Sequence, residues 1–157
     1  MKILGIDPGL GRTGYALLEQ TGNKISLKEV GCITTTIGEA EYLRLLEIKK
    51  DLDQLIKKFK PEAVCVESLF FAANVKTAMM VSQARGVILV TCADNKLKII
   101  EVTPLQVKIS ATGYGKADKR QVHRMMQTVL KLKKIPTPDD AADACAIAWA
   151  GISRMKY

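Results

Sequence analysis

Two acidic residues stand where an apolar segment gives way to a turn, a place at which carboxylates can do chemistry. Asp7 ends the apolar run 3–6, and Glu67 ends the apolar run 63–66. If the two runs are parallel neighbouring strands, both carboxylates meet at the edge where open α/β sheets hold ligands. For Asp7 alone, which precedes a Pro-Gly pair, an Asx-turn is an equally simple explanation. The same arrangement, a carboxylate directly after an apolar run, recurs at Glu67, and this recurrence favours a functional site.

Two further acids lie in the segment 138–154, which we expect to be a helix. Asp139 and Asp140 fall in its first turn, where acids favour the positive end of the helix dipole, so capping explains them sufficiently. Asp143 lacks that explanation because residues 141–151 are otherwise apolar. Burial of an unpaired carboxylate destabilises the folded state by roughly several kcal/mol, unless a cation pairs with it. Asp140 and Asp143 share a helix face at a spacing of three, and this pair predicts a bound positive charge.

Four carboxylates on elements that pack together predict a site for hard divalent cations. Oxygen ligands of this kind suit Mg²⁺ or Mn²⁺. Two such ions can stabilise both the attacking and the leaving oxygen in phosphodiester hydrolysis. We therefore expect a metal-dependent nuclease whose metal ligands and catalytic acids are Asp7, Glu67, Asp140 and Asp143.

A basic segment of the chain could bind the phosphate groups on which this chemistry acts. The chain has 24 Lys plus Arg against 16 Asp plus Glu, a formal net charge of +8, which favours a polyanion as partner. Between residues 108 and 134 Asp118 is the single acid, among basic residues that include Lys108, Lys116, Lys119 and Arg120. A solvated helix face is the simpler alternative, but so one-sided a run favours contact with nucleic acid phosphates. We place His123, the only histidine, on this helix as a surface or phosphate-contacting residue.

Hydrophobic spacing predicts the elements that would position these residues. We expect strands over 3–6, 13–18 and 24–35, a helix over 41–59, a strand over 63–66, a helix over 75–93, a strand over 97–102, and helices over 118–131 and 138–154. Three meandering strands followed by two strands that alternate with helices predict an α/β fold. Its five-stranded mixed sheet has three antiparallel strands, two parallel ones and helices on both faces.

Length and composition limit the remaining choices. At 157 residues, with 48% hydrophobic and 25% charged residues, we expect a single folded domain over 1–157. Neither a signal peptide nor a run near the ~20 apolar residues of a membrane span is evident, so we expect a cytoplasmic protein without membrane contact. The four cysteines show no CxxC pairing, which argues against zinc and disulfides.

The chain resembles the RuvC family of Holliday junction resolvases. The motifs that carry the resemblance are, in order, Asp7-Pro8-Gly9, Val66-Glu67-Ser68-Leu69-Phe70 with Asn74 after it, Gln83-Ala84-Arg85-Gly86 and Asp140-Ala141-Ala142-Asp143-Ala144. Together they cover nearly the whole chain. The resemblance implies a ribonuclease H-like fold, a homodimer, and symmetric nicking of two like-polarity strands of a four-way DNA junction during recombination and repair.

The resemblance also implies roles for individual residues. The four acids match the metal-binding carboxylates of the family, and some members carry His where this chain has Asp140. Lys108 and Lys119 match basic residues near the scissile phosphate. Phe70, which the sequence alone would place in the core, matches an aromatic residue that contacts unpaired bases at the crossover. The family further implies a dimer surface around the helix 75–93 and a branch-migration complex of RuvA and RuvB as partner.

Other functions fit the sequence less well. The glycines of 9–14 match the dinucleotide-binding pattern G-x-G-x-x-G, but a strand-like segment follows them where that motif needs a helix. An acid before a glycine-rich hairpin is also found in actin-like ATPases and sugar kinases, which share the ribonuclease H-like core. Those proteins are built from two such domains, whereas the 157 residues of this chain supply one. A non-catalytic junction-binding protein would use the same basic surface, although it would gain nothing from four acids that repel phosphate.

Overall fold

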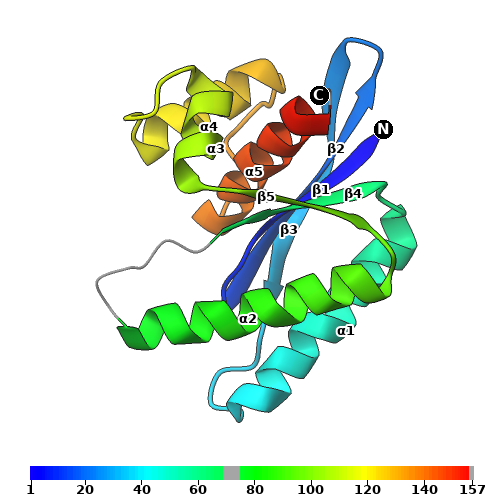
Figure 1. The fold of residues 1–157 in the computed structure, drawn as a ribbon. Helices are drawn as coiled ribbons and strands as arrows, with labels where there is room; N and C mark the ends of the chain where they lie inside the picture. The colour runs from blue at the N-terminus through cyan, green and yellow to red at the C-terminus, as the bar shows by residue number, and fades with distance from the viewer. Residues whose placement is uncertain (69–74, 156–157) are drawn as a thin grey trace.

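The computed structural model describes residues 1–68 and 75–155, which form one mixed sheet with helices on both faces (Figure 1). The strands are β1 (Lys2–Asp7), β2 (Arg12–Thr21), β3 (Lys24–Thr34), β4 (Ala63–Glu67) and β5 (Lys98–Val102). The helices are α1 (Glu41–Phe59), α2 (Val75–Asp94), α3 (Pro104–Thr112), α4 (Lys119–Val129) and α5 (Asp139–Met155). The strand order is β3-β2-β1-β4-β5. Strands β1 to β3 are antiparallel, and β4 and β5 run parallel to β1, which confirms the predicted fold class.

Alternation along the central strands assigns their side chains to two cores. Ile3 of β1 and Cys65 of β4 belong to the core shared with α5, whereas Leu4 and Val64 belong to the core on the side of α1 and α2. Successive side chains of a strand point to opposite faces. The odd-numbered ends of β1 and β4 therefore turn toward α5. In Figure 1, α3, α4 and α5 cover this face and α1 and α2 cover the other.

Helix α5 approaches the sheet closely because glycines lie beneath it. A Cβ at Gly5 would overlap the backbone of Ala144, and a Cβ at Gly14 would overlap the backbone carbonyl of Asp140. Gly14 is also the strand partner of Asp7. The same glycine therefore places the first turn of α5 beside the end of β1.

Two elements differ from the sequence-based prediction. Residues 104–112, which we did not expect to be helical, form α3. Its start is a capping box in which Thr103 Oγ1 accepts a hydrogen bond from Gln106 N and Gln106 Oε1 accepts one from Thr103 N. The basic helix is shorter than predicted and ends at Val129. In the described part of the chain, no helix combines the length and apolar character needed to cross a membrane.

Candidate active site

Asp7 and Glu67 lie at the carboxyl ends of the parallel neighbours β1 and β4. The register pairs Ile6 with Val66, so the two acids that follow are side by side at the sheet edge. Burial and the nearby charges of Asp143, Glu67 and Asp140 raise the pKa of Asp7 to about 8. The other three carboxylates therefore lie within electrostatic reach of Asp7.

The pKa of Glu67 is raised to about 7 by burial and then by the charge of Asp143. The charges of Lys119 and Lys108 oppose this rise. Asp7 and Glu67 are both partly buried, and the charge of Asp143 contributes to the raised pKa of each, so the site favours added positive charge. Strongly perturbed carboxyls in a cleft are characteristic of functional sites.

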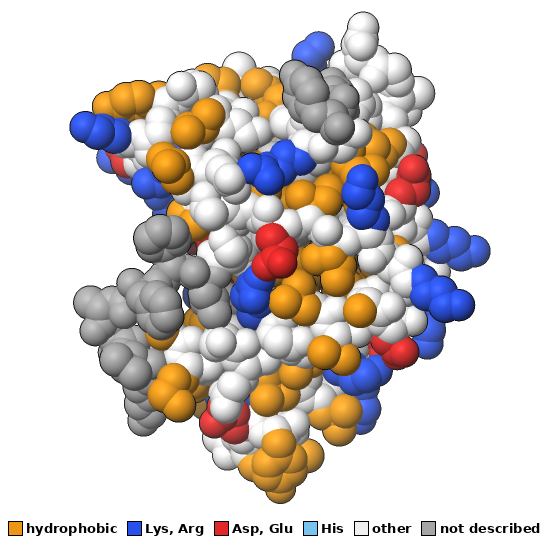
Figure 2. Space-filling model, in the orientation of Figure 1, with side chains coloured by type: hydrophobic (Ala, Val, Ile, Leu, Met, Phe, Trp, Pro, Cys, Tyr) orange, Lys and Arg blue, Asp and Glu red, His pale blue; other side chains and the backbone are white. Residues whose placement is uncertain are grey.

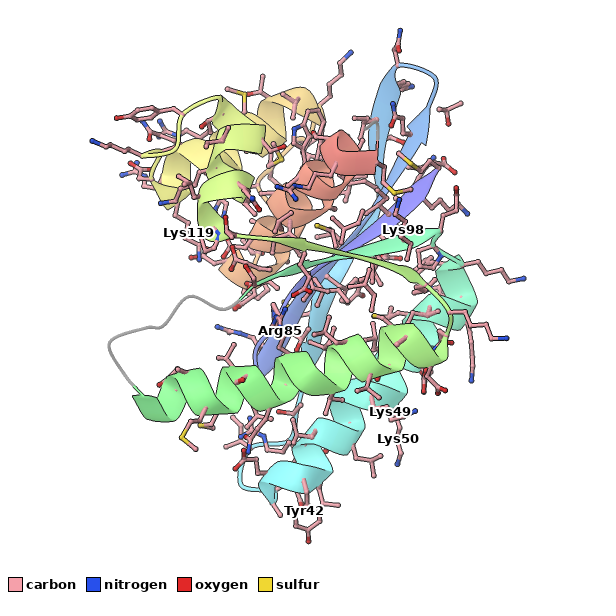
Figure 3. The ribbon with its side chains drawn as sticks, viewed as in Figure 1. Tyr42, Lys49, Lys50, Arg85, Lys98 and Lys119 are labelled. Carbon is pink, nitrogen blue, oxygen red and sulfur yellow. The ribbon has the colours of Figure 1, made fainter. Side chains whose placement is uncertain are left out.

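Cations of the protein itself contact the three acids on α5. The Nε of Arg12 lies 3.1 Å from Oδ2 of Asp140. The Nζ of Lys119 lies 2.7 Å from Oδ2 of Asp143 and 3.5 Å from Oδ2 of Asp139. Figure 3 shows Lys119 beside the beginning of α5. This contact places Asp139, for which the sequence suggested only helix capping, at the rim of the cluster.

The other oxygen of Asp143 has a different partner. His123 Nε2 lies 2.6 Å from Oδ1 of Asp143, and its side chain is 7% exposed. The prediction that His123 is a surface or phosphate-contacting residue is therefore wrong. Its position four residues after Lys119 on α4 was the available signal, because residues at that spacing share a helix face.

A cleft of about 220 Å³ opens beside the acids. Its lining includes Glu67, Lys108, Lys119 and Asp143. Two of the predicted carboxylates and two of the predicted lysines thus face the same hollow. Ammonium groups within the same cleft as carboxylates can hold a phosphate that the acids alone would repel.

The remaining predicted DNA-binding residues lie outside this cleft or outside the described residues. Lys116 precedes α4 in an exposed loop, and Arg120 is exposed on the first turn of α4. Figure 2 shows one face of the molecule with many Lys and Arg side chains and a few separate acidic ones. Phe70 falls within 69–74 and lies outside the described residues. Arg12 is a further residue of the site, which the sequence reading missed because its partner Asp140 is distant in sequence.

The donor set fits a divalent cation by its chemistry. Among the described residues, no three His, Cys, Asp or Glu side chains already form a metal-binding group. Asp140 and Asp143 are instead paired with Arg12 and with Lys119 and His123. Asp7 is partly buried, and three neighbouring acids disfavour its charged form. This arrangement fits a metal site, since hard oxygen ligands and excess negative charge suit Mg²⁺ or Mn²⁺.

The strand order β3-β2-β1-β4-β5, with acids at the ends of β1 and β4 and on α5, defines a ribonuclease H-like fold. Residues 3–150 match the family model described as crossover junction endodeoxyribonuclease RuvC. The chain therefore belongs to the RuvC family, and the resemblance seen in the sequence is confirmed.

Individual relatives agree over nearly the full length. The RuvC of Finegoldia magna is 48% identical over 159 residues, which span 100% of this chain and 97% of the relative. That of Thermosipho melanesiensis is 52% identical over 149 residues, covering 95% of both chains. The solved structure of T. thermophilus RuvC in complex with a Holliday junction substrate superposes with a TM-score of 0.92 at 33% identity. That match covers 99% of this chain and 96% of the other.

Proposed function

We propose that this protein is a structure-specific endodeoxyribonuclease that resolves Holliday junctions in homologous recombination and DNA repair. It nicks two strands of like polarity in a metal-dependent reaction. The observation that carries the proposal is the meeting of Asp7, Glu67 and the acids of α5 beside a cleft that Lys108 and Lys119 also line. Membership of the RuvC family and the likeness to a relative solved with a Holliday junction substrate support the choice of DNA substrate.

Asp7, Glu67, Asp140 and Asp143 would hold the metal, Mg²⁺ or alternatively Mn²⁺, with two ions per site. When bound, such ions lower the pKa of a bound water and stabilise the charge that develops on the phosphate oxygens. Asp7 and Glu67 are suited to this because burial and the charges of neighbouring acids raise their pKa values and so disfavour their charged forms. A cation relieves the repulsion that the fold itself creates.

Lys119 would exchange Asp143 for the scissile phosphate. Its ammonium pairs with Asp143 in the structure and lines the cleft. A divalent cation at Asp143 would release the ammonium, which would then bind the scissile phosphate. Lys108, which lines the same cleft, would hold a second phosphate oxygen. Lys116 and Arg120 would bind the flanking backbone, and Phe70 would contact unpaired bases at the crossover.

We propose a single-domain protein that acts in the cytoplasm as a homodimer, with the branch-migration proteins RuvA and RuvB as partners. One carboxylate cluster cuts one strand at a time, whereas a junction needs two opposed cuts, which a two-fold dimer supplies. Helix α2 exposes apolar side chains suited to that contact, with Met79 61% and Val90 66% exposed. Mixing wild type with excess Asp7→Asn should yield dimers that nick a junction and seldom resolve it. Complete resolution by a protein that sediments only as a monomer would contradict the dimer.

The function is tested by cleavage of a synthetic four-way junction beside a linear duplex of the same sequence. Each substrate is incubated with Mg²⁺, with Mn²⁺, and with EDTA. We expect paired, symmetry-related nicks in the junction only, and only with metal. Cleavage of both substrates at equal rates, or cleavage that persists in EDTA, would overturn the proposal.

A further inference from the structure

The carboxylate of Asp143 is held by two side chains of α4 from two sides. Lys119 and His123 stand one helical turn apart, and each reaches a different oxygen of Asp143. Oδ2 is 2.7 Å from the Lys119 ammonium, and Oδ1 is 2.6 Å from Nε2 of His123. Because a carboxylate only accepts, the imidazole must be the donor, and the proton lies on Nε2.

The two contacts differ in their access to solvent. The Lys119 side chain is 52% exposed and lines the cleft with Glu67 and Asp143. The His123 side chain is 7% exposed, and the described residues that line the cleft do not include it. Oδ2 of Asp143 therefore faces the side from which a ligand enters, while Oδ1 is bound from inside the protein.

A buried hydrogen bond on one oxygen fixes the plane of the whole carboxylate. The last torsion of Asp is broad, so an aspartate with one mobile lysine as its partner samples many orientations. The His123 side chain is buried, like those of Val122 and Met126 on the same helix, and its burial restricts rotation of the ring. The contact to His123 would thus persist after Lys119 has left Asp143.

We propose that His123 is a positioning residue of the nuclease: its Nε2–H holds Oδ1 of Asp143 so that Oδ2 stays turned toward the cleft as a metal ligand. Hydrogen bonds to metal-ligating side chains of this kind orient the ligand, and their loss lowers metal affinity or activity by about 10–100-fold. Because Asp143 is a ligand only in the proposed function, His123 has this role only if that function holds.

Two substitutions separate the hydrogen bond from the packing. His123→Leu fills a similar volume and has no donor. His123→Gln keeps an NH group at the same number of bonds from the backbone as Nε2. We expect His123→Leu to weaken Mg²⁺ binding without DNA by about 10–100-fold, and His123→Gln to stay within a few-fold of wild type. Cleavage by the Leu variant should recover as Mg²⁺ is raised, because the defect lies in occupancy.

Isothermal titration of Mg²⁺ into each folded variant measures this affinity, with circular dichroism as the check on folding. If wild type binds Mg²⁺ and His123→Leu binds it equally well, the role of His123 is overturned and the proposed function stands. If wild type binds no Mg²⁺ at the concentrations that support cleavage, both are overturned.

A spectroscopic measurement on the wild-type protein decides the case if the Leu variant fails to fold. His123 is the only histidine of the chain, so an untagged protein gives a single imidazole signal in ¹H–¹⁵N correlation spectra. We expect the tautomer with its proton on Nε2, and a shift of this signal that saturates at the same Mg²⁺ concentration as the calorimetric titration. A proton on Nδ1 alone, or a signal that Mg²⁺ leaves unchanged, would overturn the inference.

Discussion

The ammonium of Lys119 lies 2.7 Å from Oδ2 of Asp143, on the oxygen that a metal ion would need. If Asp143 is a metal ligand, as proposed, metal and ammonium would compete for it. Lys119→Ala removes both the competitor and a positive charge that repels divalent ions. We expect Mg²⁺ to bind this variant at least as tightly as wild type by isothermal titration, while junction cleavage at saturating Mg²⁺ and DNA is slowed. Weaker Mg²⁺ binding would show that Lys119 supports the site and does not compete for it.

Salt dependence tests the contact between Lys108 and the phosphate backbone. Each phosphate contact on duplex DNA contributes about −0.9 to the slope of log affinity against log salt. Lys108→Ala should make that slope shallower by about one contact and slow cleavage at saturating DNA. Lys57→Ala, on α1 at the opposite face of the sheet, is the matched control and should leave the slope unchanged. Equal slopes for wild type and Lys108→Ala would remove Lys108 from the DNA-binding surface.

The buried acids make the stability of the metal-free protein depend on pH. The pKa of Asp7 is about 8 in the folded protein against 3.8 in the unfolded chain. Between these values the folded state holds a proton that the unfolded state has released, so stability falls as pH rises through this window. Urea unfolding in EDTA from pH 5 to 9 should show this fall.

Asp7→Asn is the matching variant for that measurement. It should flatten the pH profile and exceed wild type in stability at pH 8 to 9 by the order of a few kcal/mol, since one pKa unit corresponds to about 1.4 kcal/mol. Added Mg²⁺ should stabilise wild type at pH 8 and leave Asp7→Asn nearly unaffected. A wild-type profile that rises with pH would contradict the assigned burial of Asp7.

Close packing of α5 on the sheet predicts a difference between two neighbouring glycines. A Cβ at Gly14 would overlap the carbonyl of Asp140, whereas a Cβ at Gly11 meets only the end of the Arg44 side chain at 3.5 Å. Gly14→Ala should displace the first turn of α5, destabilise the protein by about 1–3 kcal/mol, and abolish cleavage. Gly11→Ala should change stability by less than about 1 kcal/mol. Chemical denaturation and junction cleavage of both variants provide the comparison.

The sequence predicts the sheet and the position of the acids because hydrophobic runs and the alternation of side chains along a strand determine both. Apolar runs that end in Asp7 and Glu67 indicate buried strands, and their parity places both acids on the face of α5. The helix α3 was missed because its apolar content is unpatterned, although Thr103 and Gln106 carry a capping-box signal. The pairing of His123 with Asp143 could not be read from spacing alone, because it depends on how α4 and α5 pack.

The variant Asp7→Asn tests the central claim most directly when binding and cleavage of one four-way junction are measured on the same preparation. It removes one carboxyl ligand from the proposed metal site and leaves the lysines of the cleft and the exposed basic residues in place. We predict junction affinity within a few-fold of wild type in the absence of metal, together with loss of cleavage at every Mg²⁺ concentration. Cleavage within tenfold of the wild-type rate by this folded variant would contradict the assignment of a metal-dependent nuclease site to Asp7 and its neighbouring acids.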